Sequence, residues 1–163
     1  MVSKRLANEE GHRRKLLVIV DESAECDRAV TFAALRAAKS NGLLDMLYVI
    51  PPGDFQHWLG VEEIMRAEAR EAADLMLARY ADLATSLADV TVEKVVREGQ
   101  TREQIDLLIE EDQDIATLVL AAGGGKDGPG PLVSSIGTRG AAFPIPVTVV
   151  PAGITDDEIH GVV

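Results

Sequence analysis

Short runs of apolar residues alternate along the chain with longer segments in which apolar side chains recur every three or four positions. A run that is apolar on both faces is typical of a strand whose sheet is covered by helices on both sides, and the longer period is typical of an amphipathic helix. The alternation predicts an α/β protein with an open five-stranded parallel sheet and helices on both faces. The expected strands are residues 15–20, 43–50, 90–96, 115–120 and 147–150.

Turn and capping residues predict where the helices begin and end. Ser23 is a candidate N-cap for the first helix, and Asn41-Gly42 supplies its end because both residues tolerate the left-handed conformation. Thr101 and Gln104 have the spacing of a capping box that would open the third helix. The long second helix is expected to bury one stripe of apolar residues, namely Val61, Ile64, Met65, Ala69, Ala72, Met76, Tyr80, Leu83 and Leu87.

Length and composition are those of one globular domain. The chain has 163 residues, of which 47% are hydrophobic and 26% charged, and this balance excludes a disordered protein. Residues 1–13 are predicted to be a frayed N-terminal tail, residues 14–151 the domain, and residues 152–163 a C-terminal tail.

Net charge and cysteine content limit which partners and which cellular compartment are expected. The net charge of −11 repels phosphodiester backbones, so non-specific nucleic-acid binding is not expected. The single cysteine, Cys26, excludes an intramolecular disulfide and fits a reducing compartment. No apolar run approaches the roughly 18–20 residues that cross a bilayer, and the polar start is not a secretory signal. We therefore expect a cytoplasmic protein with neither nucleic acid nor a membrane as its partner.

The segment 121–138 is rich in glycine, follows a predicted buried strand and leads into a short helix. Glycine lets the backbone approach a ligand closely, and the free N–H groups at a helix start attract anions. In a doubly wound sheet, ligands bind at the carboxyl ends of the strands where the strand order reverses. The segment is therefore either a phosphate cradle or a plain connecting loop, and composition alone favours neither.

From Lys15 to Pro151 the chain resembles the universal stress proteins, and the glycine-rich segment carries part of that resemblance. Family members that bind ATP have a glycine, two residues, a glycine, nine residues, a glycine, and then Ser or Thr. Without gaps, these positions fall on Ala121, Gly124, Ser134 and Ser135, of which Gly124 and Ser135 match. The resemblance also rests on Val18-Ile-Val-Asp21, Leu47-Tyr-Val-Ile50, Glu98-Gly99, Asp114 and Pro146-Val-Thr-Val-Val150.

A second register of the motif uses Gly125, Gly128, Gly137 and Thr138. It recovers every residue type but needs one deletion. The gapless register keeps the apolar pattern of the fourth strand aligned with the family and is preferred.

The resemblance implies an adenine nucleotide, ATP or AMP, bound together with Mg²⁺, and a role in regulating partner interactions in a stress response. It implies that Asp21 approaches the adenosine end and that Val49 recognises the base through backbone groups. From the residues alone, a helix-entry residue without a ligand is the favoured interpretation of Asp21. The remaining contacts to ribose and phosphates are implied for Ala121, Gly124, Gly125, Ser134, Ser135 and Ile136. Ala121 and Ser134 stand where the family motif has glycine. An alternative is therefore a family member that binds no nucleotide and acts as a dimeric interaction module.

Other chemistry-bearing residues have simpler readings. Lys126 and Arg139 flank the glycine-rich segment and either neutralise phosphate or are solvated. His57 and Trp58 are expected to seat the long helix rather than to cover the site. The histidines lack metal-ligand spacing, so no zinc site is expected, and Cys26 is predicted to be inert core.

No enzyme motif is complete in the sequence. The phosphate-loop and dinucleotide-binding fingerprints do not occur, and Val133-Ser-Ser-Ile-Gly137 is only close to the hydrolase elbow. No base is positioned for attacking water, so at most slow ATP hydrolysis is expected. A phosphatase or nucleotidyl transferase is a weaker alternative, because the motifs of such relatives are missing.

The strand at Pro146–Val150 predicts the oligomeric state. It is an apolar edge strand, which invites pairing with another copy, and the family resemblance implies a homodimer formed through it. Light scattering of the purified protein should therefore give twice the 17.5 kDa of one chain. A mass near 17.5 kDa at every concentration would instead identify a monomer whose edge is blunted by proline.

Overall fold

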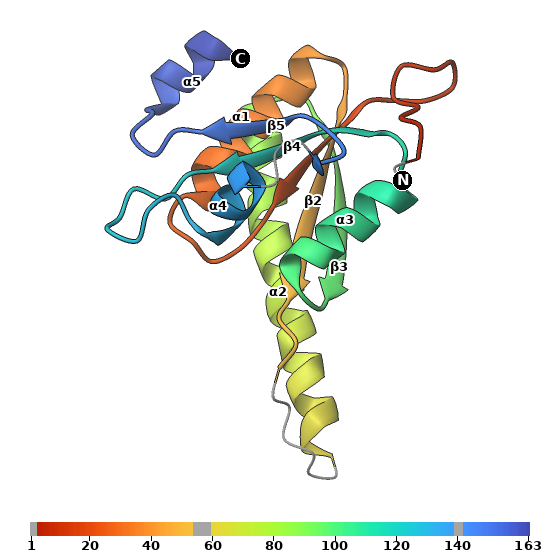
Figure 1. Cartoon of the computed structure of the whole chain (residues 1–163), viewed down its shortest axis with the longest axis vertical. Helices are drawn as coiled ribbons and strands as arrows, with labels where there is room; N and C mark the ends of the chain where they lie inside the picture. Colours follow the sequence, from red (N-terminus) through yellow and green to blue (C-terminus); the bar gives the residue numbers. More distant parts are fainter. Residues whose placement is uncertain (1–2, 54–59, 139–141) are drawn as a thin grey trace.

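The computed structural model describes residues 3–53, 60–138 and 142–163, and its strands form one open parallel sheet (Figure 1). The order across the sheet is β3-β2-β1-β4-β5. The expected five-stranded α/β sheet is confirmed, and the last strand lies at its edge, as predicted. The strands are β1 (Lys15–Ile19), β2 (Leu43–Ile50), β3 (Thr91–Glu98), β4 (Ile115–Ala121) and β5 (Val147–Val150).

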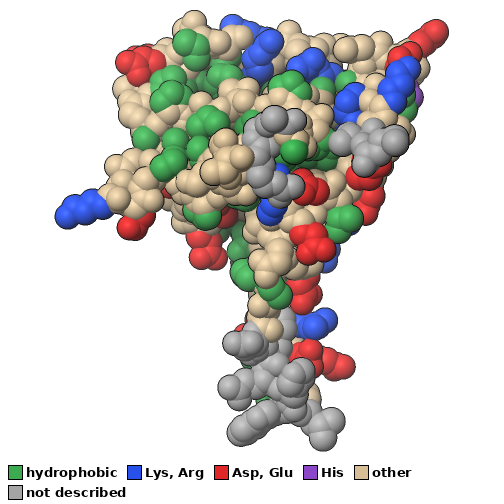
Figure 2. All heavy atoms as spheres, in the orientation of Figure 1, with side chains coloured by type: hydrophobic (Ala, Val, Ile, Leu, Met, Phe, Trp, Pro, Cys, Tyr) green, Lys and Arg blue, Asp and Glu red, His purple; other side chains and the backbone are tan. Residues whose placement is uncertain are grey.

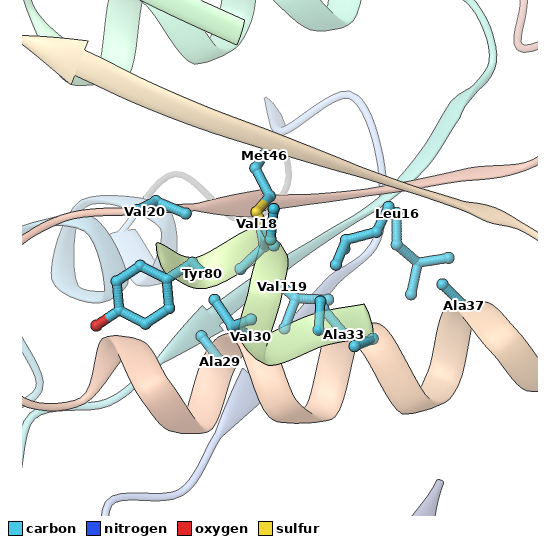
Figure 3. Packing of buried hydrophobic residues seen from close by; sticks show 14 of the residues in the cluster. Leu16, Val18, Val20, Ala29, Val30, Ala33, Ala37, Met46, Tyr80 and Val119 are labelled. Atoms are coloured by element: carbon cyan, nitrogen blue, oxygen red, sulfur yellow. The ribbon is translucent and has the colours of Figure 1, made fainter. Parts of the chain in front are cut away.

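Helices cover both faces of the sheet because β1 is apolar on both sides. Leu16, Val18 and Val20 pack with α1 and α2 (Figure 3), whereas Leu17 and Ile19 pack with α3 and α4. This alternation follows from the two-residue period of a strand. The helices are α1 (Cys26–Lys39), α2 (Val61–Leu87), α3 (Thr101–Glu111), α4 (Pro131–Thr138) and α5 (Asp156–Val162).

The end of α1 is as predicted, but its beginning is not. Asn41 has a φ of 53°, and a Cβ on Gly42 would lie 2.8 Å from the carbonyl oxygen of Arg14, so glycine is required there. At the start, Glu25 occupies the N-cap position without a side-chain cap. Ser23 instead donates its hydroxyl to Asp21 Oδ1 at 2.5 Å, which ties it to the preceding turn.

The expected capping box at Thr101 is also wrong. Gln100 is the N-cap of α3, Thr101 is already helical, and no side chain caps the helix. The Gln104 side chain lies beside Gly99 instead. A complete capping box is found at α5, where Thr155 accepts from the Glu158 amide and the Glu158 carboxylate accepts from the Thr155 amide.

The buried stripe of α2 differs from the predicted one because the helix projects beyond the sheet (Figure 1). Its 27 residues span about 40 Å, whereas an eight-residue strand spans roughly 26 Å. The first residues of the stripe, Val61, Ile64 and Met65, are therefore exposed. The buried positions lie in the C-terminal half, at Ala73, Leu77, Tyr80, Ala81 and Ala84.

Both expected tails contact the domain. The Arg5 guanidinium donates to the carbonyls of Ile109, Asp112 and Ile115 at 2.7, 3.1 and 3.3 Å, so this part of residues 1–13 is not frayed. At the other end, α5 packs against α1 and buries Ile159 completely. Among the described residues, no helix combines the length and the apolar character that a membrane crossing needs.

Asp45 is an acidic residue in the interior of β2. It is 1% exposed, lies in register with Glu93 of β3, and neither of its carboxylate oxygens has a hydrogen-bond partner in the described part of the chain. Burial, together with the charges of Glu93 and Asp112, raises the pKa of Asp45 to about 7.

This raised pKa predicts that the protein loses stability as the pH rises. The neutral form of Asp45 is favoured in the fold, so its contribution is present at low pH and lost as the pH passes through about 7. In EDTA, the advantage of Asp45→Asn over the wild type in free energy of unfolding should grow by about 3 kcal/mol between pH 5 and pH 8. Urea unfolding measures it, with Asp89→Asn, an exposed carboxylate, as the control. An advantage independent of pH would contradict the assignment.

Candidate functional site

The carboxyl edge of the sheet holds three adjoining hollows that share Pro131, the first residue of α4. One of about 420 Å³ lies between the ends of β1 and β2 and the start of α3. One of about 730 Å³ lies over the glycine-rich loop. The smallest, about 80 Å³, lies between the start of α1 and the end of β4. The three hollows therefore meet around Pro131.

The 420 Å³ hollow brings together three residues that the sequence singled out. Asp21 follows β1, Val49 lies near the end of β2, and Ser135 lies on α4. Asp21 is exposed, and its Oδ1 accepts from both the amide and the hydroxyl of Ser23, which holds the turn into α1. Val49 is partly buried against the core on the α3 side. The hollow thus has an apolar wall and a carboxylate at its rim.

Arg102 lines the same hollow and was missed by the sequence analysis. Its Nη1 donates to Ser135 Oγ at 2.8 Å, its guanidinium lies 5.1 Å from the centre of the Phe143 ring, and its Nε lies 3.5 Å from Asp106 Oδ1. The Ser135 hydroxyl is therefore already bonded to a cation. Arg102 follows the third strand, whereas the glycine-rich segment singled out in the sequence follows the fourth. A cation in the first turn of the helix after Glu98-Gly99 was the available signal.

The 730 Å³ hollow is lined by Gly124, Gly125 and Ser134 together with Arg28 of α1. Arg28 was also missed: its Nη2 donates to the Ala122 carbonyl at 3.4 Å, and its buried Nε has no hydrogen-bond partner in the described residues. It lies far from the loop in sequence, and only the fold brings the two together.

The loop uses part of its own hydrogen-bonding capacity internally. The Gly123 amide donates to Pro129 O at 2.9 Å, and the Gly128 amide donates to Gly125 O at 3.2 Å. Outside helices and strands, the amides of Gly124 and Gly125 donate to no backbone carbonyl of the described residues. Two adjacent amides beside an arginine form an arrangement suited to an anion.

The remaining predicted residues are divided between the wall and the interior. Ala121, at the end of β4, lines the smallest hollow, whereas Ile136 is 7% exposed and packs into the core on the α3 side. Lys126 is exposed and lines none of the three hollows. Arg139, His57 and Trp58 lie outside the described residues.

Comparisons with known proteins relate this chain to one family. The model of the universal stress protein family matches residues 12–151. The structure of universal stress protein UspA from Lactobacillus plantarum is 25% identical, with a TM-score of 0.66 over 84% of this chain and 97% of that one. No curated protein matched the sequence.

Two further solved structures similar to this chain contain nucleotides. A universal stress protein in complex with cAMP is 19% identical, with a TM-score of 0.64 over 86% of this chain and 98% of that one. The universal stress protein from Archaeoglobus fulgidus in complex with dAMP is 16% identical, with a TM-score of 0.56 over 84% and 97%. At these identities the likeness concerns the fold.

Cys26 is the buried first residue of α1 and lines the smallest hollow, so its predicted place in the core is confirmed. Burial raises the pKa of the thiol from 9.0 to about 11, and the thiol lies 3.8 Å from the Ile19 carbonyl oxygen. The burial and the raised pKa make Cys26 a poor nucleophile, because the thiolate is the reactive form.

A native-state thiol assay tests this environment. At pH 8 the raised pKa alone lowers the thiolate fraction about 100-fold, so Cys26 should react with a disulfide reagent at least that much more slowly than free cysteine. Urea-unfolded protein is the control and should release one equivalent rapidly. Fast stoichiometric labelling of the native protein would mean that this hollow opens to solvent.

Proposed function

The chain belongs to the universal stress protein family, and from this we propose that it binds an adenine nucleotide, ATP or AMP, which regulates its interactions with partner proteins in a stress response. The observation that carries the proposal is the pair of amides at Gly124 and Gly125 beside the unpartnered Nε of Arg28. An anion in this hollow would pair with the Arg28 guanidinium and accept from the two amides, and a guanidinium nitrogen without an acceptor is costly.

In this proposal the nucleoside end occupies the 420 Å³ hollow. Its volume is in the range of small-ligand sites. Ile19 and Val49 offer apolar contact to a base, and Asp21 offers an acceptor to ribose hydroxyls or an amino group. The relatives with cAMP and dAMP support an adenine nucleotide as the ligand class.

The phosphates then extend past Pro131 into the larger hollow. There they accept from Gly124 and Gly125 and pair with Arg28, and the Ser134 hydroxyl supplies a further donor. Glu25 and Asp127 line the same hollow, so a Mg²⁺ carried by the phosphates would reduce repulsion between these carboxylates and the ligand.

An interaction module without nucleotide is the second candidate. It is favoured by the Ser135 hydroxyl, which bonds to Arg102, and by Ser134 and Ala121 at glycine positions of the family motif. Its binding surface would be the edge strand β5, where Val149 is 42% exposed and where hydrophobic side chains gather with those of α4 (Figure 2). An edge strand of this kind can pair with a second copy.

Thermal unfolding with and without nucleotide separates the two candidates. A ligand at 100 times its Kd adds about 2.7 kcal/mol, which raises the Tm of a domain of this size by roughly 5–10 °C. Calorimetry with adenosine, AMP and ATP, each with Mg²⁺, should give the tightest binding for a phosphorylated ligand. No Tm shift at millimolar nucleotide, together with no nucleotide released on denaturation, would favour the interaction module.

Arg28→Met tests where the phosphates lie. Loss of a charge-assisted contact should weaken ATP binding by at least about tenfold while changing adenosine binding by less than about twofold. Arg70→Met removes an exposed arginine from α2 and is the matched control for the change in net charge. Equal weakening of ATP and adenosine by Arg28→Met would contradict the proposed orientation.

A further inference from the structure

Three carboxylates meet near the amino end of the sheet, away from the hollows. Asp45 of β2 and Glu93 of β3 are register partners, so their side chains share the α3 face of the sheet. Asp112, the C-cap of α3, reaches the same point. One oxygen from each of the three carboxylates lies within 4.8 Å of the other two. This cluster joins two strands and a helix end.

The inner carboxylate of the cluster has no partner. Asp45 is 1% exposed, and neither oxygen accepts a hydrogen bond from the described residues. Lys15 is the nearby cation, and its Nζ donates to Glu93 at 2.9 Å and to Asp112 at 2.8 Å, but not to Asp45. A buried carboxylate that accepts no hydrogen bond is unfavourable, so the interior of the cluster is incomplete as it stands.

The charge of the cluster matches one divalent cation. Three carboxylates and the Lys15 ammonium sum to −2 when all are ionised. The neighbouring cations are committed elsewhere: Arg97 pairs with Glu111, and Arg5 donates to three carbonyls. The three carboxylates offer oxygen ligands, which hard divalent cations prefer.

We propose that Asp45, Glu93 and Asp112 form a binding site for a hard divalent cation. Ca²⁺ takes oxygen ligands at about 2.3–2.6 Å, so oxygens on opposite sides of the ion lie roughly 4.6–5.2 Å apart, and the cluster is already within this spacing. The Glu93 side chain is 43% exposed and gives the ion a path from solvent. The ion would share Glu93 and Asp112 with the Lys15 ammonium, which donates to both carboxylates.

The test uses the full chain, stripped with EDTA and free of nucleotide, so that failure of the nucleotide proposal leaves it unaffected. Mn²⁺ is the probe, because bound Mn²⁺ is read from water-proton relaxation, and Ca²⁺ is the competitor. We expect one Mn²⁺ per chain with a Kd below about 1 mM, displaced by Ca²⁺. No binding up to about 10 mM Mn²⁺ would overturn the proposal.

Variants identify the ligands. Asp45→Asn should weaken Mn²⁺ binding by at least about 30-fold, and Lys15→Met should strengthen it by at least about tenfold because a repelling charge is removed. Asp114→Asn is the matched control: this carboxylate follows α3 closely, pairs with His12 at 2.7 Å and lies outside the cluster. Equal Mn²⁺ affinity in Asp45→Asn and the wild type would overturn the site, as would a loss of affinity in Asp114→Asn equal to that in Asp45→Asn.

Asp45→Asn also separates loss of a ligand from loss of the fold. In EDTA at pH 8, where Asp45 is ionised, it removes a buried charge and should melt no lower than the wild type, while the Tm increase that Mn²⁺ gives the wild type disappears. If Asp45→Asn melts lower than the wild type in EDTA, Mn²⁺ binding by Glu93→Gln decides whether the site exists. The Glu93 side chain is partly exposed, so its replacement should not unfold the protein, and a loss of Mn²⁺ binding would then report the loss of a ligand.

Discussion

The pairing of β1 with β2 on one side and β4 on the other is the constraint on which the rest of the structure depends. The chain leaves β1 toward one side and returns later to the other, so the strand order reverses beside β1. The loops at the carboxyl edge must part there, and the three hollows lie in the resulting gap. The parallel arrangement also places every strand start at the opposite edge, where Lys15, Asp45 and Glu93 meet Asp112.

The fold class could be predicted because β1, β2 and β4 are largely buried and leave clear apolar runs in the sequence. Helix ends were harder to predict. The Asn41-Gly42 end is right because the left-handed turn and the close approach of Arg14 require these residue types. The caps at Ser23 and Thr101 are wrong because each residue type also suits a neighbouring position, and only the backbone conformation decides between them.

The site could be predicted only in part, because sequence proximity does not reveal which side chains share a hollow. Asp21, Val49 and Ser135 do meet, since the rule for parallel sheets directs attention to strand ends. Arg28 comes from α1, and no local pattern links it to the glycine-rich loop, whereas Arg102 left only its position in the first turn of α3 as a signal. Asp45 left a signal that was passed over: it is the only charged residue in the apolar run 43–50.

The contacts of Arg5 bear on how the protein is best prepared. Its guanidinium closes the end of α3 by serving three carbonyl oxygens, one of which belongs to Asp112. A shortened chain that begins at the first strand would leave those oxygens to solvent and loosen the helix end that carries Asp112. Affinity handles placed ahead of Ser3 with a flexible spacer, and purification of the chain at full length, preserve that closure.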